Sequence, residues 1–126
     1  MDSERAILLV DHGSRSSKAN AQLQQVASLV QRHAPGIAIA WAHMELGSPT
    51  IEQAMADLAQ AGVRDVVVVP YMLAPGRHAT EDVPRLVRAA ARAQGGLTVR
   101  VSECLGVDDL LAQLVVERAK AAGLGL

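Results

Sequence analysis

The chain has 126 residues, of which 50% are hydrophobic, and this length predicts a single domain, residues 1–126, with a core of its own. Its 12 lysines and arginines face 13 aspartates and glutamates, and a net charge of -1 argues against a nucleic-acid partner. The single cysteine, Cys104, excludes an intrachain disulfide framework and favours a cytoplasmic protein. Residues 1–5 carry charges ahead of a short apolar run, which fits neither a signal peptide nor a membrane span.

Four short apolar segments are expected to be strands, because each is rich in branched residues and ends at turn-forming residues. They lie at residues 6–10, 37–42, 66–69 and 97–102. The third segment is an unbroken run of valines, which predicts a strand buried on both faces of a parallel sheet. In the fourth, apolar and polar residues alternate, which predicts a strand at the edge of the sheet.

Four helices are expected after these strands, since apolar residues recur there at helical spacing. Ser16 or Ser17 caps the first helix, the third runs from about residue 80 to residue 93, and Asp108 with Asp109 begins the last. Each helix is expected to bury one apolar stripe, and these stripes are Leu23, Val26, Ala27 and Val30; Ile51, Ala54, Met55 and Leu58; Val83, Leu86, Val87, Ala90 and Ala91; and Val107, Leu110, Leu111, Leu114 and Val115.

The resulting order of elements predicts an α/β fold, a small doubly wound four-stranded parallel sheet with helices on both faces. With right-handed crossovers we expect the strand order 2-1-3-4. This order places the switch point between the first and third strands, and ligands of such sheets bind at the carboxyl ends of the strands beside that point.

Three side chains that can bind a metal follow different strands and are expected to converge at this edge: His12, Glu45 and His78. Imidazole and carboxylate groups suit a divalent metal and leave coordination positions open for another ligand. Any one of the three alone fits an ordinary solvated loop residue equally well. His33 is interpreted as a surface residue, and His43 is expected to point away from Glu45.

Charged residues flank the two candidate histidines. Arg15 and Arg77 are placed to bind carboxylates of an acidic ligand, whereas Lys18 is interpreted as ordinary solvated charge. Asp11 and Asp82 are placed to orient a histidine through its second ring nitrogen, although Asp82 also fits the first turn of a helix.

Three motifs in order at strand ends resemble the small CbiX/SirB-type sirohydrochlorin chelatases, and the similarity covers nearly the whole chain. It is nearest to the short, single-domain ferrochelatases that include the chloroplast type. The motifs are Val10-Asp11-His12-Gly13-Ser14-Arg15 with Asn20; Ala42-His43-Met44-Glu45-Leu46 with Pro49 and Ile51; and Pro70 with Leu73-Ala74-Pro75-Gly76-Arg77-His78, Asp82 and Pro84.

The resemblance implies a chelatase that inserts Fe²⁺ or Co²⁺, or Ni²⁺, into sirohydrochlorin for sirohaem or cobalamin biosynthesis. It implies a class II chelatase fold and a homodimer. By position, His12 and His78 become the catalytic, metal-binding and proton-accepting residues, with Glu45 as a metal or proton partner. Ser14, Arg15 and Arg77 become binding residues for the macrocycle.

Two departures from the family pattern accompany the resemblance. Gly47-Ser48-Pro49 stands where members often have Ala-Glu-Pro, so a second carboxylate near the site is absent and the metal preference is open. The chloroplast type carries a cysteine-bound iron–sulfur cluster, and with Cys104 as the single cysteine no such cluster is expected here.

Two other functions are compatible with the same residues. A protein that stores or delivers a metal or a tetrapyrrole without catalysis would use the same ligands. Histidine phosphatases also place a His-Gly pair after the first strand, but their pattern has an arginine before that histidine. Here Asp11 occupies the position, and its charge disfavours a phosphate.

Overall fold

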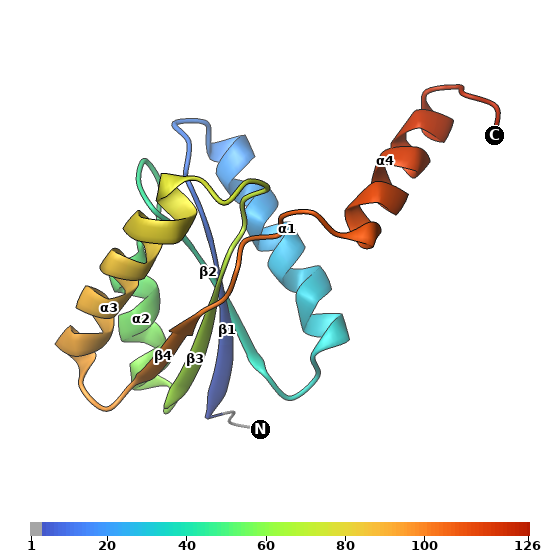
Figure 1. The fold of residues 1–126 in the computed structure, drawn as a ribbon. Coiled ribbons are helices and arrows are strands. Elements are labelled where there is room, and N and C mark those ends of the chain that lie inside the picture. Colours follow the sequence, from blue (N-terminus) through green and yellow to red (C-terminus); the bar gives the residue numbers. More distant parts are fainter. Residues whose placement is uncertain (1–3) are drawn as a thin grey trace.

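Four parallel strands form the centre of the molecule in the computed structural model, which describes residues 4–126 (Figure 1). The prediction that residues 1–5 form no signal peptide or membrane span falls partly on residues 1–3, which lie outside the described residues. The elements are β1 (Arg5–Asp11), α1 (Ser17–His33), β2 (Ala38–His43), α2 (Ile51–Gln60), β3 (Asp65–Pro70), the π-helical turn η1 (His78–Asp82), α3 (Val83–Gln94), β4 (Thr98–Val101) and α4 (Asp109–Ala121).

The sheet has the order β2-β1-β3-β4, so the predicted fold class and strand order are confirmed. β1 is central: Leu8 lies opposite Ala40 of β2 on one side and opposite Val68 of β3 on the other. A strand with neighbours on both sides and helices above and below has no exposed position for polar residues, which explains the apolar run at its centre.

Helices cover both faces of the sheet, as predicted, but unequally (Figure 1). On one face α2 and α3 pack over the sheet and make the main core, whose fully buried members include Leu8, Met55, Val66, Val68 and Val87. On the other face α1 alone lies over β1 and β2, and Leu23 and Ala27 pack there against Leu9. The predicted stripes of the first three helices therefore meet the sheet.

The prediction that the third strand is buried on both faces is wrong. Val66 and Val68 are fully buried under α2 and α3, whereas Val67 and Val69 on the side of α1 are only half-buried. The reason is that α1 covers β1 and β2 and leaves β3 without a helix on that side. A run of valines indicates a strand, but it does not show how many helices cover it.

The last helix also departs from the prediction. None of its residues is buried, so the expected buried stripe of Val107, Leu110, Leu111, Leu114 and Val115 is wrong for the described chain. Figure 1 shows α4 projecting away from the sheet with the carboxyl terminus at its far end. Its start is as predicted, because the Asp108 side chain accepts a hydrogen bond from the Leu110 amide at 2.9 Å.

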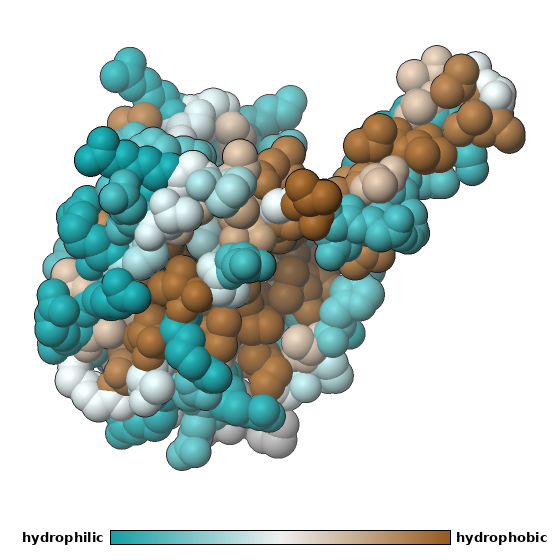
Figure 2. Space-filling model, viewed as in Figure 1, coloured by the Kyte–Doolittle hydropathy of each residue, from teal (hydrophilic) through white to brown (hydrophobic). Residues whose placement is uncertain are grey.

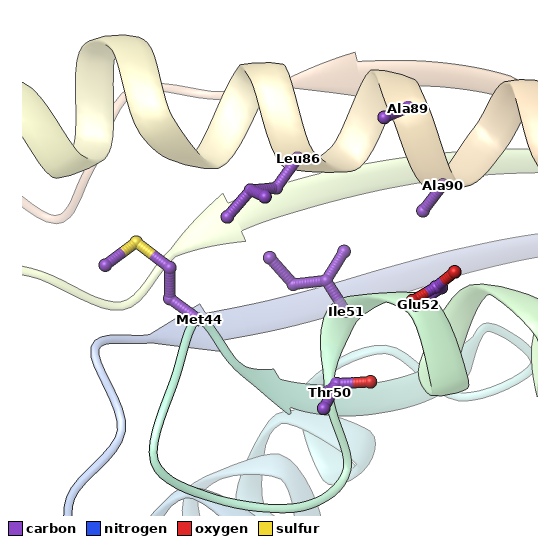
Figure 3. Close-up of a pocket in the computed structure, with 7 residues that line it drawn as sticks. All are labelled: Met44, Thr50, Ile51, Glu52, Leu86, Ala89 and Ala90. Atoms are coloured by element: carbon purple, nitrogen blue, oxygen red, sulfur yellow. The ribbon is translucent and has the colours of Figure 1, made fainter.

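A small cavity of about 310 Å³ lies between α2 and α3 (Figure 3). Ile51 and Leu86 point toward each other across it, and Met44 closes the end nearest the carboxyl edge of the sheet. Its polar lining is limited to Thr50 and Glu52, so this cavity holds no set of groups suited to metal chemistry.

Candidate metal-handling site

Two imidazole rings face each other at the carboxyl edge of the sheet. The ring centroids of His12 and His78 are 4.5 Å apart and the planes are nearly perpendicular, at 88°. His12 directly follows β1 and His78 begins η1, and these segments leave neighbouring strands, since Val10 pairs with Pro70 and its carbonyl accepts from the Tyr71 amide at 2.7 Å. Both side chains are exposed, so a ligand can reach them from solvent.

The ring of His78 is oriented by a carboxylate one helical turn away. Its Nδ1 lies 2.9 Å from Oδ2 of Asp82. A carboxylate only accepts hydrogen bonds, so in the neutral imidazole this contact favours the tautomer with the proton on Nδ1, which leaves the lone pair of Nε2 to bind a metal or accept a proton. The predicted role of Asp82 as an orienting carboxylate is therefore matched by a contact.

The local backbone at His78 differs from the expectation. His78 was expected in a loop and the following helix from about residue 80, but a π-helical turn already begins at His78 and runs to Asp82. Thr80 does not cap a helix. Its hydroxyl donates to the Gly76 carbonyl at 3.1 Å, within the turn. Single π-turns of this kind are common at functional sites.

The loop that carries His12 is held against the loop after β2 by backbone contacts. The Met44 amide donates to the Asp11 carbonyl at 2.9 Å, and the Glu45 amide donates to the His12 carbonyl at 3.1 Å. Gly13 has a φ of +87°, and a Cβ at this position would lie 1.6 Å from the Glu45 carbonyl oxygen. Only glycine therefore allows these two loops to approach so closely.

Asn20 fixes the turn that follows Gly13, a role that the sequence did not reveal. Its Oδ1 accepts from the Ser14 amide at 2.9 Å, and its Nδ2 donates to the Ser14 carbonyl at 2.7 Å and to the Leu46 carbonyl at 3.4 Å. Gly47 makes room for this side chain, because a Cβ there would lie 2.6 Å from Nδ2 of Asn20. A polar residue in the first helical turn after a Gly-Ser turn is the only signal that the sequence carries for it.

A second, buried pair lies beneath the loops. His43 is 1% exposed, and its Nδ1 is 2.6 Å from Oδ1 of Asp11, which is 23% exposed. Asp11 does orient a histidine, as predicted, but that histidine is His43 and not His12. The two residues are directly opposite each other in the β1–β2 register, so the contact follows from strand pairing.

The other predicted site residues stay near the surface. Glu45 is exposed, and its amide contacts the His12 loop, but no group of three His, Cys, Asp or Glu side chains within residues 4–126 is close enough to hold a metal ion. Its role as a metal ligand remains a prediction. Arg15 and Lys18 are exposed, and so is His33, as expected for a surface residue.

The remaining predicted binding residues also have local contacts. Arg77 forms a solvent-exposed ion pair with Glu81 at 3.2 Å. The Ser14 hydroxyl accepts from the Ser16 amide at 3.0 Å, so Ser14 supports the start of α1 in this state. Ser14 and Arg77 make these contacts while lying next to the imidazoles in the chain, in the loops at the carboxyl edge of the sheet.

A cavity of about 840 Å³ lies near the carboxyl end of β4 and reaches the residues that follow His78. It is formed by the segment from Leu73 to Pro75, the start of η1 and the segment that follows β4. Ala79 and Thr80, the two residues after His78, line it, whereas the imidazoles lie outside its lining. The volume is in the range of small-molecule sites.

The structure combines a doubly wound α/β sheet with two accessible imidazoles at the carboxyl edge, where ligands of such sheets bind. Comparison with known families identifies the kind of protein: the family model described as CbiX matches residues 6–122. The chain therefore belongs to the CbiX family, and the family resemblance predicted from its motifs is confirmed.

Individual relatives agree with this assignment. The chain is 36% identical over 112 residues to the chloroplastic sirohydrochlorin ferrochelatase of Arabidopsis thaliana, which covers 89% of this chain and 50% of the plant protein. It is 34% identical over 127 residues to the sirohydrochlorin cobaltochelatase of Methanococcoides burtonii, covering 94% of this chain and 97% of that protein. The solved structure of SirB from Bacillus subtilis with Fe³⁺ matches with a TM-score of 0.86 at 27% identity, over 96% of this chain and 48% of SirB.

The lengths of these relatives differ in an informative way. The chain spans nearly the whole of the Methanococcoides protein but only about half of the plant protein and of SirB.

No helix in the part of the chain that the structure describes has the length and apolar character needed to cross a bilayer.

Proposed function

We propose that this chain is a sirohydrochlorin chelatase that inserts Fe²⁺ or Co²⁺ into the macrocycle. The observation that carries this assignment is the facing pair of His12 and His78, 4.5 Å apart at neighbouring strand ends, in a chain of the CbiX family. The relatives named as ferrochelatase and cobaltochelatase support both metals. The absence of a carboxylate at Gly47-Ser48 leaves the preference between them to be measured.

The chemistry of insertion fits what two exposed imidazoles provide. Each pyrrole N–H that breaks releases a proton to a base, and the electron pair left on nitrogen binds the incoming metal. An imidazole with a free Nε2 lone pair can bind the cation before transfer or accept the proton afterwards. The contact of Asp82 with Nδ1 leaves Nε2 as the ring nitrogen of neutral His78 that can take this role.

Neighbouring charges would hold and orient the macrocycle. Sirohydrochlorin is a polycarboxylate, and Arg15 and Arg77 are exposed cations at the edge where the imidazoles lie. Ser14 adds a hydroxyl donor in the same loop. In this scheme Glu45 is a third ligand or proton carrier that joins the imidazoles when metal or macrocycle binds.

The decisive experiment is anaerobic mixing of the protein with sirohydrochlorin and Fe²⁺ or Co²⁺, followed by the change in absorbance of the macrocycle. His12→Ala and His78→Ala are expected to lose most of the acceleration over the protein-free reaction, while circular dichroism stays that of the wild type. His33→Ala is the matched control, since it removes an exposed imidazole at the far end of α1. Retention of full activity by both site variants would contradict the assignment.

The same assay separates catalysis from delivery. A carrier would bind Co²⁺ at His12 and His78 and still leave the insertion rate at the level of the protein-free control. A chelatase increases that rate at sub-stoichiometric protein and turns over more than once. Metal binding without turnover would show that the protein is a metal carrier and not a chelatase.

The proposed functional unit is a homodimer in the cytoplasm. The half-length match to SirB supports the dimer, because a chain that contains about half of a larger relative can supply the other half with a second copy. The cysteine content supports the cytoplasm, because a single cysteine provides no disulfide framework of the kind used in oxidising compartments.

A further inference from the structure

Three arginines form a line along the outer side of α3, which we call the cationic stripe. Arg85, Arg88 and Arg92 are spaced three and four residues apart, so they lie within about 60° of one another around the helix axis. All three are exposed, whereas Val83 and Ala90 on the opposite side of the helix are buried. Figure 2 shows hydrophilic residues over α3 on this side of the molecule.

The cationic stripe has no acidic counterpart within its own helix. From Val83 to Gln94, α3 contains three arginines and neither aspartate nor glutamate. The neighbouring helix α2 has the opposite character, since it carries Glu52 and Asp57 and contains neither lysine nor arginine. The whole chain has a net charge of -1, so the positive charge on α3 is a local concentration and does not follow from the composition.

The stability of α3 does not account for the stripe. Within residues 4–126, neither Arg88 nor Arg92 forms an ion pair with a carboxylate. Like charges four residues apart on a helix repel each other, so these two arginines oppose the helix and do not support it. Arg92 lies in the last turn, where a cation is favourable, but this reason does not apply to Arg88 in the middle of the helix.

The cationic stripe begins at the imidazole pair. Nη2 of Arg85 lies 3.7 Å from Oδ1 of Asp82, and the other oxygen of this carboxylate lies 2.9 Å from Nδ1 of His78. Arg88, one turn further along, lines the cavity of about 840 Å³ that reaches the residues after His78. From Arg85 to Arg92 the helix advances about 10 Å. The stripe therefore extends from the candidate site outward along one side of the molecule.

We infer that the cationic stripe attracts the polycarboxylate macrocycle and increases the rate at which it reaches His12 and His78. The inference rests on the proposed function and names the surface over which that substrate approaches. Exposed ion pairs add little affinity, but at an ionic strength of about 0.01 M the field of several like charges extends over a Debye length of about 30 Å. Such a field increases the rate of association with an oppositely charged ligand about tenfold or more.

The test is anaerobic stopped-flow mixing of the protein with metal-free sirohydrochlorin, followed by the fluorescence of the macrocycle. Arg88→Glu reverses the central charge of the stripe and is expected to lower the association rate constant about tenfold at an ionic strength of about 0.01 M. At about 1 M salt the Debye length falls to about 3 Å, so the difference from the wild type should disappear. The dissociation rate constant should change little, because the stripe acts on the approach of the ligand.

Two further variants separate the field of the stripe from net charge and from direct contact. Arg88→Lys keeps the positive charge and should associate as fast as the wild type, because attraction at a distance does not require a guanidinium group. Arg32→Glu makes the same change of net charge at the far end of α1, where Arg32 is exposed, and should leave association nearly unchanged. Arg88→Glu places a carboxylate four residues before Arg92, which is a favourable helical pair, so its circular dichroism and urea unfolding should be those of a folded protein.

The outcomes separate the stripe from the proposed function. An association rate that Arg88→Glu leaves unchanged, or that Arg32→Glu lowers equally, would overturn the role of the stripe. A decrease that persists at about 1 M salt, or that also occurs in Arg88→Lys, would overturn it as well, because the cause would then be a direct contact and not the field. Association that depends on Arg88 as expected, in a protein that inserts no metal, would overturn the proposed function alone.

Discussion

Replacing Gly13 by alanine tests how closely the two site loops must approach. The new Cβ would lie 1.6 Å from the Glu45 carbonyl oxygen, and contacts of this kind are essentially never shorter than 3.0 Å, so the His12 loop and the Glu45 loop must separate. The separation breaks or stretches the hydrogen bond from the Glu45 amide to the His12 carbonyl. The imidazole of His12 then moves away from that of His78.

The loss of stability in Gly13→Ala has two parts, and a control variant separates them. A positive φ at a residue with a Cβ costs about 1–2 kcal/mol, and overpacking adds about 1–3 kcal/mol. Gly62 has a φ of +92°, but a Cβ there meets no atom within 4 Å. Gly62→Ala therefore has only the backbone strain of the positive φ and no overpacking. We expect Gly13→Ala to lower the free energy of unfolding by about 2–5 kcal/mol and Gly62→Ala by about 1–2 kcal/mol.

The assays are urea unfolding for stability and metal insertion for function. A displacement of about 1 Å at a reacting group can cost about a hundredfold in rate, so Gly13→Ala should lose activity even where it is folded, whereas Gly62→Ala should keep it. If the free energies of unfolding of the two variants agree within about 0.5 kcal/mol and both insert metal equally fast, the close approach of the two loops matters neither for stability nor for activity.

Three further substitutions, one of them with a control variant, test the side-chain contacts in and beneath the site loops. Asn20→Ala removes the bonds to the Ser14 backbone and should cost about 1–3 kcal/mol in urea unfolding; unchanged stability would contradict its role in the turn. Asp11→Ala leaves His43 buried without its partner and should lower the free energy of unfolding by about 1–3 kcal/mol. Asp65→Ala, the control, breaks an exposed ion pair and should lower it by less than about 1 kcal/mol. Equal losses of stability in the two variants would refute the distinction between the buried and the exposed pair. Asp82→Ala should slow insertion about tenfold with little change in unfolding, and an unchanged rate would show that His78 needs no orienting carboxylate.

The meeting of His12 and His78 could be predicted because it depends on topology. Each histidine follows a strand that the sequence identifies, and the order 2-1-3-4 makes those strands neighbours. The buried pair of Asp11 and His43 needed the register as well, since a shift of one residue between β1 and β2 would separate them. The bonds of Asn20 depend on the path of two loops, and no periodicity in the sequence encodes that path.

From its amino-acid sequence alone this protein could be assigned four strands, four helices, a parallel sheet, an edge that carries two histidines, and a family. These features follow from local patterns, because apolar periodicity and turn residues act within a few positions of the chain. Tertiary structure alone decided that His78 and Asp82 lie in a π-turn, that the histidine oriented by Asp11 is the buried His43, and that β3 has no helix over one of its faces. It also decided that α4 lies apart from its own sheet. An apolar stripe indicates that a helix packs against some surface, but only the path of the chain determines whether that surface belongs to the same molecule.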